Sequence, residues 1–425
     1  MAPFTAYCRG LVGPKRILFL QHAGALGGSC VSLQVLLQNL DRSRFEPVVA
    51  LLRESEEVLA YHRAAGCEIV PWPGIETFEH TTAEWAALGH PWGWPGAARS
   101  AWGWNRSRRR TVELLERVRP ALVHLNSAVL SPSAAALRDS RLPFVWHVRE
   151  SPPPGGAAWT RWLGRALARW PSVAIFMTPL SRRMWNTGGE GEIVPESVDL
   201  SRFSPNHGRE GARDRLGIPA EARVVLYVGG LPEIKGIRPL LGALAALRRR
   251  DPGIVCLMPG AEPSLPSPLA RTVRTALTAF GMHSPGEQLE RALASLGDAC
   301  RVSRFSEGVA DMLAASDVLA FPAVRDHFAR PVMEAFAAGR PVVASRLPLL
   351  QEMVSDGETG SLVNPGDPAA LAAELGRLLA DSDLRRRMGA AGRVVAEALH
   401  DARRNTDATM KIYDRILAGR DSDGR

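Results

Sequence analysis

The sequence predicts an α/β protein with two doubly wound domains, each built on a parallel sheet that helices cover on both faces. Short apolar runs alternate with longer segments of helical periodicity along most of the 425 residues. Strands that are apolar on both faces are typical of parallel sheets buried between helices. The pattern occurs twice, with a break rich in Pro and Gly at residues 198–219. We therefore expect two Rossmann-like domains facing across a cleft, with a ligand at the carboxyl ends of the strands.

Nine apolar runs are expected to form strands, five in the first domain and four in the second. They are residues 16–20, 45–52, 121–125, 144–148, 173–177, 224–228, 254–258, 318–321 and 341–344. A period of about 3.6 residues marks helices between and after them. These are residues 29–40, 107–118, 239–249, 368–379 and 401–417. The domains are thus expected at residues 1–200 and 201–398, followed by a C-terminal helix at 399–425 that packs back on the first domain.

The composition is that of a globular protein, with 46% hydrophobic and 23% charged residues, so each domain can bury its own core. The net charge is +8, but only three of the 52 basic residues are lysine, and an arginine-rich chain is most simply the result of coding bias. A basic chain suits phosphorylated substrates or an anionic membrane surface as well as nucleic acid. Because no nucleic-acid recognition motif accompanies the charge, we expect no nucleic-acid partner.

The five cysteines stand singly, without a CxxC pair. Such a set is typical of reduced thiols in a cytoplasmic protein and argues against a disulfide framework or a zinc site. No apolar run approaches the roughly 18 residues that a membrane-spanning helix needs. We therefore expect a cytoplasmic protein without a metal or another cofactor.

Two segments depart from the alternation of strands and helices. Residues 71–104 hold six of the eleven tryptophans and are followed by the basic run 106–110. Residues 161–170 have the pattern of an amphipathic surface helix, and tryptophan with arginine suits a peripheral contact with an anionic membrane surface. The same tryptophans are equally compatible with packing inside the first domain or with stacking on a sugar acceptor. Residues 259–297 form a long insertion that is rich in Pro at first and then helical.

A candidate ligand site follows the predicted strand at residues 318–321. Pro331 suits the first turn of a helix and Gly339 its C-terminal end. Asp326 then lies in the loop before this helix and Glu334 on its first or second turn, so both carboxylates can face one ligand. Exposed backbone amides along the same loop are expected to bind hydroxyls and phosphate, and this segment comprises Phe328, Ala329, Arg330, Pro331 and Val332. In the alternative interpretation, Asp326 caps a turn and Glu334 only favours the helix start electrostatically.

Lys235 marks a second candidate site. It stands in residues 227–236, which have the pattern of a strand, a glycine turn and the start of a helix. A lysine at this point adds a full positive charge to the helix N-terminal dipole, as a diphosphate leaving group requires. The alternative is a solvated surface lysine, but the chain has only three lysines and one of them occupies this position.

The glycine-rich turn at residues 22–29 is a third candidate. It places Gly27 and Gly28 where a helix is predicted to begin, and such a turn lets the backbone approach a phosphate or a sugar. The turn is neither a Walker loop nor a GxGxxG dinucleotide fingerprint, so it is weak evidence when taken alone.

Three polar residues at the carboxyl end of the predicted strand 144–148 form a fourth candidate on the cleft side. Arg149 is expected to contact an acceptor or a phosphate, and Glu150 to orient it. His147 is a candidate acid or base. Because strand alternation puts His147 and Arg149 on one face, either can instead be a structural core residue.

The spacing Asp326-x7-Glu334, followed by residues 335–344, resembles the E-x7-E segment of retaining glycosyltransferase family 4, which has the GT-B fold and is also called glycosyl transferases group 1. Further positions fit this family, namely residues 193–203, Glu352, residues 356–357, 360–363, 365–367, 384–385 and 388–389. The resemblance implies that Asp326 contacts the hydroxyls of the donor sugar and that Glu334 holds the nucleotide ribose. It also implies that Lys235 neutralises the diphosphate and that the loop at Gly27 and Gly28 lies near the diphosphate and the acceptor.

Several positions depart from the pattern of this family. The first acidic residue is Asp326, which is one methylene shorter than the usual glutamate. Gly230 stands where the family has an arginine that shares the diphosphate charge with the lysine, and Arg238 is a candidate substitute. Arg149-Glu150 replaces a His-Asp pair found in many relatives, and Glu196-Ser197 replaces Asn-Gly in the segment between the domains.

The resemblance implies a retaining, hexosyltransferase-like enzyme that moves a sugar from a nucleotide-sugar donor to a glycan or lipid-linked acceptor in cell-surface polysaccharide or glycolipid synthesis. Asp326, Lys235 and Arg149 are the expected catalytic residues, while His147 and Glu150 are the acceptor-side candidates. The leaving diphosphate is expected to take the acceptor's proton, so Asp326 orients the sugar and is not assigned as a nucleophile. The alternatives are a nucleotide-sugar epimerase with the same fold and a degenerate, non-catalytic binding protein, which Gly230 and the shortened Asp326 favour.

Overall fold

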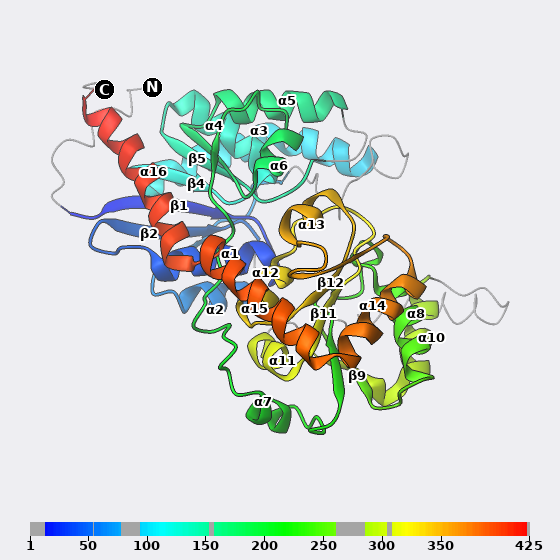
Figure 1. The fold of residues 1–425 in the computed structure, drawn as a ribbon. Coiled ribbons are helices and arrows are strands. Elements are labelled where there is room, and N and C mark those ends of the chain that lie inside the picture. The colour runs from blue at the N-terminus through cyan, green and yellow to red at the C-terminus, as the bar shows by residue number, and fades with distance from the viewer. Residues whose placement is uncertain are drawn as a thin grey trace. The chain divides into compact units, whose positions relative to one another are not determined.

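The computed structural model describes residues 13–53, 55–77, 94–152, 157–260, 285–303 and 308–422. The chain forms two compact units. Unit 1 comprises Met1–Asp199 together with Leu399–Arg425, and unit 2 comprises Leu200–Ala398. Each unit is built on its own parallel sheet, with helices between successive strands (Figure 1).

The sheet of unit 1 has seven parallel strands in the order β3-β2-β1-β4-β5-β6-β7. The strands are β1 (Lys15–Gln21), β2 (Phe45–Leu51), β3 (Glu68–Pro71), β4 (Leu122–Leu125), β5 (Phe144–Val148), β6 (Val173–Phe176) and β7 (Glu192–Ile193). The helices are α1 (Gly28–Asn39), α2 (Glu56–Arg63), α3 (Trp94–Val118), the 3-10 turn η3 (Ala128–Leu130), α4 (Ser131–Ser140), α5 (Ala157–Arg169), α6 (Pro179–Met184) and α16 (Ala402–Ser422).

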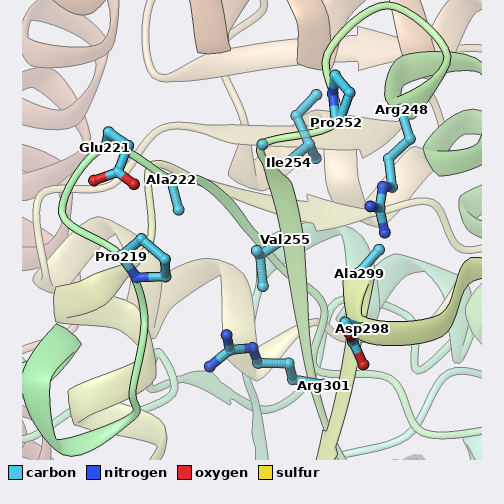
Figure 2. Close-up of a pocket in the computed structure, with 11 residues that line it drawn as sticks. Pro219, Glu221, Ala222, Arg248, Pro252, Ile254, Val255, Asp298, Ala299 and Arg301 are labelled. Atoms are coloured by element: carbon cyan, nitrogen blue, oxygen red, sulfur yellow. The ribbon is translucent and has the colours of Figure 1, made fainter.

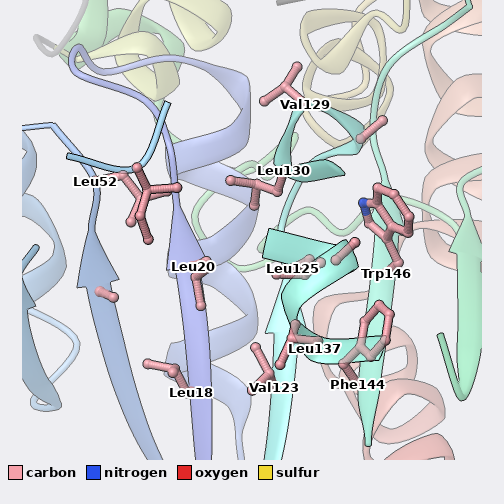
Figure 3. Packing of buried hydrophobic residues seen from close by; sticks show 14 of the residues in the cluster. Leu18, Leu20, Leu52, Val123, Leu125, Val129, Leu130, Leu137, Phe144 and Trp146 are labelled. Atoms are coloured by element: carbon pink, nitrogen blue, oxygen red, sulfur yellow. The ribbon is translucent and has the colours of Figure 1, made fainter. Parts of the chain in front are cut away.

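Strand alternation divides the interior of unit 1 into two cores, one on each face of the sheet. On β1, Leu18 and Leu20 enter the core that α3, α4 and α5 cover, part of which is shown in Figure 3. Ile17 and Phe19 enter the opposite core, beside α1 and α16. Tyr413 of α16 is fully buried in that second core. The C-terminal helix is therefore an integral part of unit 1.

The sheet of unit 2 has six parallel strands in the order β10-β9-β8-β11-β12-β13. The strands are β8 (Arg223–Leu226), β9 (Ile254–Pro259), β10 (Cys300–Ser303), β11 (Val318–Phe321), β12 (Val342–Ser345) and β13 (Gly360–Val363). The helices are α7 (Arg209–Arg215), the 3-10 turn η4 (Glu233–Lys235), α8 (Ile237–Arg248), α10 (Pro285–Leu296), the 3-10 turn η5 (Gly297–Ala299), α11 (Val309–Ala315), α12 (Arg330–Ala337), α13 (Pro348–Met353), α14 (Pro368–Ala380) and α15 (Ser382–Leu399).

The strand order places one topological switch point in each unit. In unit 1 the chain builds outward from β1 to β3 and then resumes on the other side of β1 with β4. In unit 2 it builds from β8 to β10 and resumes beside β8 with β11. Ligands of open parallel sheets bind beyond the carboxyl ends of the two strands at this reversal. The loops after β1 and β4, and those after β8 and β11, are therefore the places to look for a site.

The nine expected strands are all present, each within two residues of its predicted bounds. The strands β3, β7, β10 and β13 are absent from the prediction, and all four are edge strands. The helix expected at residues 107–118 begins earlier, at Trp94, and the break at 198–219 contains the short helix α7. Residues 78–93 of the tryptophan-rich stretch and 261–284 of the insertion lie outside the described residues. In the ranges that the structure describes, no helix is long and apolar enough to cross a membrane.

Candidate functional site

Two interlocked loops form the switch point of unit 2. The loop after β8 contains η4 and leads into α8, and the loop after β11 leads into α12. The backbone N–H of Val324 in the second loop donates to the carbonyl oxygen of Ile234 in the first, at 2.9 Å. Gly236 has a φ of +81°, and a Cβ at this position would lie 1.7 Å from the carbonyl oxygen of Pro322. Only glycine permits this approach, which holds the preceding residue, Lys235, beside the end of β11.

The ammonium of Lys235 is positioned as the sequence predicts, at the turn that opens α8. Its side chain is partly buried, and desolvation lowers the pKa of Lys235 to about 8. Within the described part of the chain, no carboxylate forms an ion pair with this ammonium. A desolvated cation without an internal counter-ion, placed at a switch point, is suited to bind an anionic group of a ligand.

Gly230 lies in the same loop at a φ of +65°, and a Cβ there would be 3.0 Å from the carbonyl oxygen of Gly260. A side chain at this position is strained, because L-residues rarely adopt this backbone conformation. The expected substitute, Arg238, donates from Nε to Glu233 Oε1 at 2.9 Å, and both side chains are exposed. Arg238 therefore already has an acidic partner at the start of α8.

Asp326 lies in the loop before α12, as predicted, and it also caps another helix. Its carboxylate accepts a hydrogen bond from the backbone N–H of Leu349 at the start of α13, with distances of 3.1 and 3.3 Å to the two oxygens. Burial raises the pKa of Asp326. The contact with Leu349 thus agrees with the alternative interpretation of Asp326 as a capping residue. The aspartate side chain, although shorter than glutamate, reaches the start of α13 from this loop.

The helix α12 begins at Arg330 with Pro331 in its first turn, and it is followed by Gly339 at a φ of +66°. Glu334 is on the second turn and pairs with Arg330, with 2.8 Å between Oε1 and Nε. Both side chains are less than one tenth exposed. The carboxylate of Glu334 therefore pairs with the first residue of its own helix.

The expected row of exposed amides from Phe328 to Val332 needs one correction. The N–H of Val332 donates to the carbonyl oxygen of Ala329 at 3.0 Å, so this amide belongs to the first turn of α12. The side chains of Ala329 and Val332 are fully buried, and that of Phe328 is partly buried. This segment therefore packs into unit 2 with its side chains, and only its backbone before α12 remains available to a ligand.

One residue of this loop was not singled out from the sequence. His327 directly follows Asp326 and is 8% exposed. Its Nδ1 lies 2.9 Å from the carbonyl oxygen of Arg325, and its ring packs on Phe321. The sequence signal for His327 is a histidine between two acidic positions, in the loop that follows a buried strand.

In unit 1, the predicted glycine turn lies at the switch point. Gly27 is the N-cap of α1 and Gly28 its first residue. A Cβ built on either glycine meets no atom within 4 Å, so the space above the start of α1 is open. From the loop after β4, Asn126 Nδ2 donates to the carbonyl oxygen of Ser29 at 3.1 Å and ties this loop to the first turn of α1. An open helix N-terminus of this kind suits a phosphate or a sugar hydroxyl.

Arg149 lies beside this switch point but is engaged inside unit 1. Its Nη1 pairs with Glu196 Oε2 at 2.6 Å, and the two side chains are only 7% and 5% exposed. Its Nε donates to Asn126 Oδ1 at 2.8 Å. The two departures from the family pattern, Arg149 and Glu196, are thus direct partners of each other. This geometry favours a structural role for Arg149 over contact with an acceptor.

Glu150 and His147 are also interior groups. The carboxylate of Glu150 accepts hydrogen bonds from the hydroxyl of Ser127 and the backbone N–H of Ala128, so it caps η3. Burial raises the pKa of Glu150. Burial, together with the neighbouring Arg149, lowers the pKa of His147 well below its ordinary value. The structural alternative for His147 is therefore better supported than its acceptor-side interpretation, and Glu150 also has an interior contact as the cap of η3.

A cavity of about 210 Å³ in unit 2 lies at the amino ends of the strands (Figure 2). Its lining includes Ile254 at the start of β9 and Arg301 near the start of β10. These are the amino ends of parallel strands, whereas Lys235 and Asp326 follow the carboxyl ends. The cavity is therefore separate from the candidate site. Among the described residues there is no cluster of three or more His, Cys, Asp or Glu side chains that could hold a metal ion.

Known proteins resemble this chain in sequence over part of its length. A family model described as "Glycosyl transferases group 1" matches residues 208–395. D-inositol 3-phosphate glycosyltransferase of Streptomyces scabiei is 37% identical over 211 residues, which are 48% of this chain and 44% of the relative. The enzyme of the same name from Corynebacterium efficiens is 35% identical over 201 residues, or 46% and 44% of the two chains. The match thus spans less than half the length of these relatives.

Solved structures resemble almost the entire chain. Anabaena HepE in complex with UDP has a TM-score of 0.71 at 17% identity and covers 94% of this chain and 100% of its own. Sucrose-phosphate synthase of Thermosynechococcus elongatus has a TM-score of 0.69 at 20% identity, with 95% and 100% covered. At these identities the likeness shows the fold, which is GT-B as predicted. In sequence, the match to the group 1 glycosyltransferases covers residues 208–395, which are less than half of the chain.

Proposed function

We propose that this chain transfers a sugar, with retention of anomeric configuration, from a nucleotide-sugar donor bound by unit 2 to a glycan or lipid-linked acceptor. The observation that carries the proposal is Lys235, a desolvated ammonium without a carboxylate partner in the described chain, at the switch point of a group 1 glycosyltransferase domain. Structures of HepE with UDP and with UDP-glucose are among those with this fold.

In the proposed reaction, the bond between the anomeric carbon and the diphosphate oxygen breaks while the acceptor oxygen bonds to the same face of the sugar. The acceptor's proton passes to the departing diphosphate oxygen. Lys235 and the N-terminus of α8 stabilise the negative charge that develops on that diphosphate. Glu334 holds the nucleotide ribose, and Asp326 orients the sugar from the loop that it ties to α13.

The proposal assigns no metal ion to this charge stabilisation. Lys235 supplies a full positive charge, and helix N-termini at α8 and α12 supply partial charges. Sugar transfer is therefore expected to continue at an unchanged rate in the presence of EDTA.

A thermal-shift screen with UDP-, GDP-, ADP- and dTDP-glucose tests donor binding. The wild-type protein is expected to be stabilised by one nucleotide class at millimolar concentration, while Lys235→Ala is not stabilised by the same compound. Stabilisation of both proteins to the same extent would contradict the assignment of Lys235. The same screen followed by product analysis separates transfer from epimerisation, because an epimerase returns an altered nucleotide sugar without releasing the diphosphate.

We also propose that unit 1 contacts an anionic membrane surface through the outer faces of α3 and α5. These helices cover the same face of the sheet (Figure 1), and Trp104 of α3 contacts Trp162 of α5 with 6.1 Å between ring centroids. Trp102 of α3 is 91% exposed. The outer face of α5 carries the exposed arginines Arg161, Arg165 and Arg169 at a spacing of four residues. An exposed tryptophan on one helix and a row of cations on a helix that packs on the same face suit an interface with anionic lipid headgroups.

A further inference from the structure

His327 presents a buried hydrogen-bond acceptor that no group of the described chain uses. Its Nδ1 is 2.9 Å from the carbonyl oxygen of Arg325, and since a carbonyl can only accept, Nδ1 carries the proton. In a neutral imidazole the other nitrogen, Nε2, is then an acceptor. Nε2 is buried and has no hydrogen-bond partner among the described residues.

The ring of His327 is fixed in place. It packs on Phe321, the last residue of β11, with 5.3 Å between ring centroids and an interplanar angle of 48°. The hydrogen bond to Arg325 prevents rotation about the bond from Cβ to the ring. Burial and the positive charge of Lys235 lower the pKa of His327 to about 3, so the imidazole is neutral at physiological pH.

Leaving a buried acceptor without a donor costs about 1–3 kcal/mol. Lys235 is a second polar group at the same switch point that lacks a carboxylate partner within the described residues. The loops after β8 and β11 that carry the two side chains are interlocked, since the N–H of Val324 donates to the carbonyl oxygen of Ile234 and Gly236 is held against Pro322. One group is a cationic donor and the other a neutral acceptor. A ligand that satisfies both carries an anionic oxygen for Lys235 and a hydrogen-bond donor, such as a sugar hydroxyl, for His327.

We propose that Nε2 of His327 accepts a hydrogen bond from a hydroxyl group of the donor sugar while Lys235 binds the diphosphate. His327 is then a specificity-determining residue that selects donors whose sugar has a free hydroxyl at that position. The assignment rests on the proposed function and adds to it a contact with the sugar itself. Sugars that lack this hydroxyl leave the buried acceptor unsatisfied and bind more weakly.

Two substitutions separate this role from a structural one. His327→Phe keeps an aromatic ring against Phe321 and removes Nε2. His327→Gln places an amide oxygen about as far from the backbone as Nε2 and restores an acceptor. The readout is binding measured by isothermal titration calorimetry with a nucleoside diphosphate alone and with its glucose derivative, UDP and UDP-glucose first and then the GDP, ADP and dTDP pairs.

We expect His327→Phe to bind the nucleoside diphosphate like the wild type and to lose roughly 10- to 100-fold in affinity for the nucleotide sugar, with most of the loss recovered in His327→Gln. Equal affinity of wild type and His327→Phe for the nucleotide sugar overturns the assignment. Equal loss for both ligands also overturns it, because the histidine then supports the loop and does not contact the sugar. If the wild type binds none of these compounds, the proposed function itself is wrong, and the contact with His327 fails with it.

Discussion

Lys235 has a fixed backbone position, a lowered pKa and a charge that an anionic ligand favours. The glycine that follows it is held against Pro322, which fixes the backbone beside the end of β11. Desolvation disfavours its charge and lowers its pKa to about 8. An anionic ligand reverses that effect, because a nearby negative charge favours the ammonium. Lys235 is therefore charged when a diphosphate binds and sensitive to pH when the site is empty.

The depressed pKa of Lys235 predicts a pH dependence of donor use. Below pH 8 the free enzyme has a charged Lys235, and as the pH rises above 8 this charge is lost. Since kcat/KM reports the ionisation of the free enzyme, we expect it to fall about tenfold per pH unit above pH 8. The bound diphosphate raises the pKa of Lys235, so kcat is expected to fall only at higher pH. Initial rates between pH 6 and 10 measure both profiles.

Lys235→Arg is the matched control for this profile, because a guanidinium stays charged throughout this range. Whatever its absolute rate, the variant is expected to show no fall in kcat/KM near pH 8. A fall at the same pH in both proteins would assign the titration to another group and contradict the role given to Lys235.

At the scale of secondary-structure elements, unit 2 depends on a buried carboxylate at the amino end of β11. Asp317 accepts from Arg209 of α7 at 2.7 Å, from Arg213 of α7 at 3.3 Å and from the backbone N–H of Val224 at 2.8 Å. The same two arginines donate to the carbonyl oxygens of Ser316 and Ala315 at the end of α11. One acidic residue thus joins α7, α11, β8 and β11 at the amino ends of the strands, whereas the candidate site follows their carboxyl ends.

Asp317→Asn is expected to lower the free energy of unfolding of unit 2 by about 3–5 kcal/mol, because it leaves buried guanidinium charge without a counter-ion. Urea denaturation followed by circular dichroism measures the change. Asp383→Asn is the control, since Asp383 pairs with Arg386 on the exposed surface of α15 and such pairs contribute little. Comparable stability losses in the two variants would contradict the role of Asp317.

The elements that the sequence predicts are those buried on both faces. All nine predicted strands exist, whereas the four missed strands, β3, β7, β10 and β13, are the edges of the two sheets. An edge strand has one neighbour, and its sequence lacks the continuous apolar run of a central strand. β7 has only two residues, and β3 has an exposed residue at each end. Periodicity alone does not detect such short strands, whether they are half exposed like β3 or buried like β13.

The sequence predicts those residues of the candidate site whose positions follow from local rules for helix starts. It does not predict contacts between side chains from distant segments. Lys235 and Pro331 take the predicted places at helix starts because local rules determine them. The pairing of Arg149 with Glu196 joins residues 47 positions apart and gives both an interior role. The contact of Asp326 with the start of α13 is equally non-local. No spacing rule reveals such partners.

At the scale of the whole molecule, the two units follow one plan but differ in their surfaces. Unit 2 contains the segment that matches the glycosyltransferase family, and unit 1 carries the arginine row of α5 together with the exposed Trp102. This distribution agrees with a division of labour in which unit 2 binds the donor and unit 1 meets the acceptor or the surface that holds it.

The arginine row predicts binding of the protein to anionic vesicles. Each arginine near an anionic surface contributes about 1 kcal/mol, so replacing Arg161, Arg165 and Arg169 by Gln is expected to weaken binding about 100-fold at low salt. Sedimentation with vesicles that contain phosphatidylglycerol measures the change, and vesicles of phosphatidylcholine alone are expected to bind neither protein.

The matched control replaces three exposed arginines on α15 and α16, Arg387, Arg403 and Arg404, by Gln. It changes the net charge by the same amount and is expected to keep vesicle binding. If both triple variants lose binding equally, the effect reflects net charge alone. Equally tight binding of the wild type to double-stranded DNA would also count against a lipid-specific surface.

The most direct test of the central claim is release of nucleoside diphosphate from the nucleotide sugar that the thermal-shift screen selects, measured for the wild type and for Lys235→Gln with a panel of glycan and lipid-linked acceptors. We expect the wild type to release the diphosphate and to form a glycosylated product, and the variant to be slower by about 10²- to 10³-fold, as for the loss of a main charge-stabilising donor. Saturable donor binding by the wild type without release or transfer to any acceptor would contradict the claim and identify a non-catalytic binding protein.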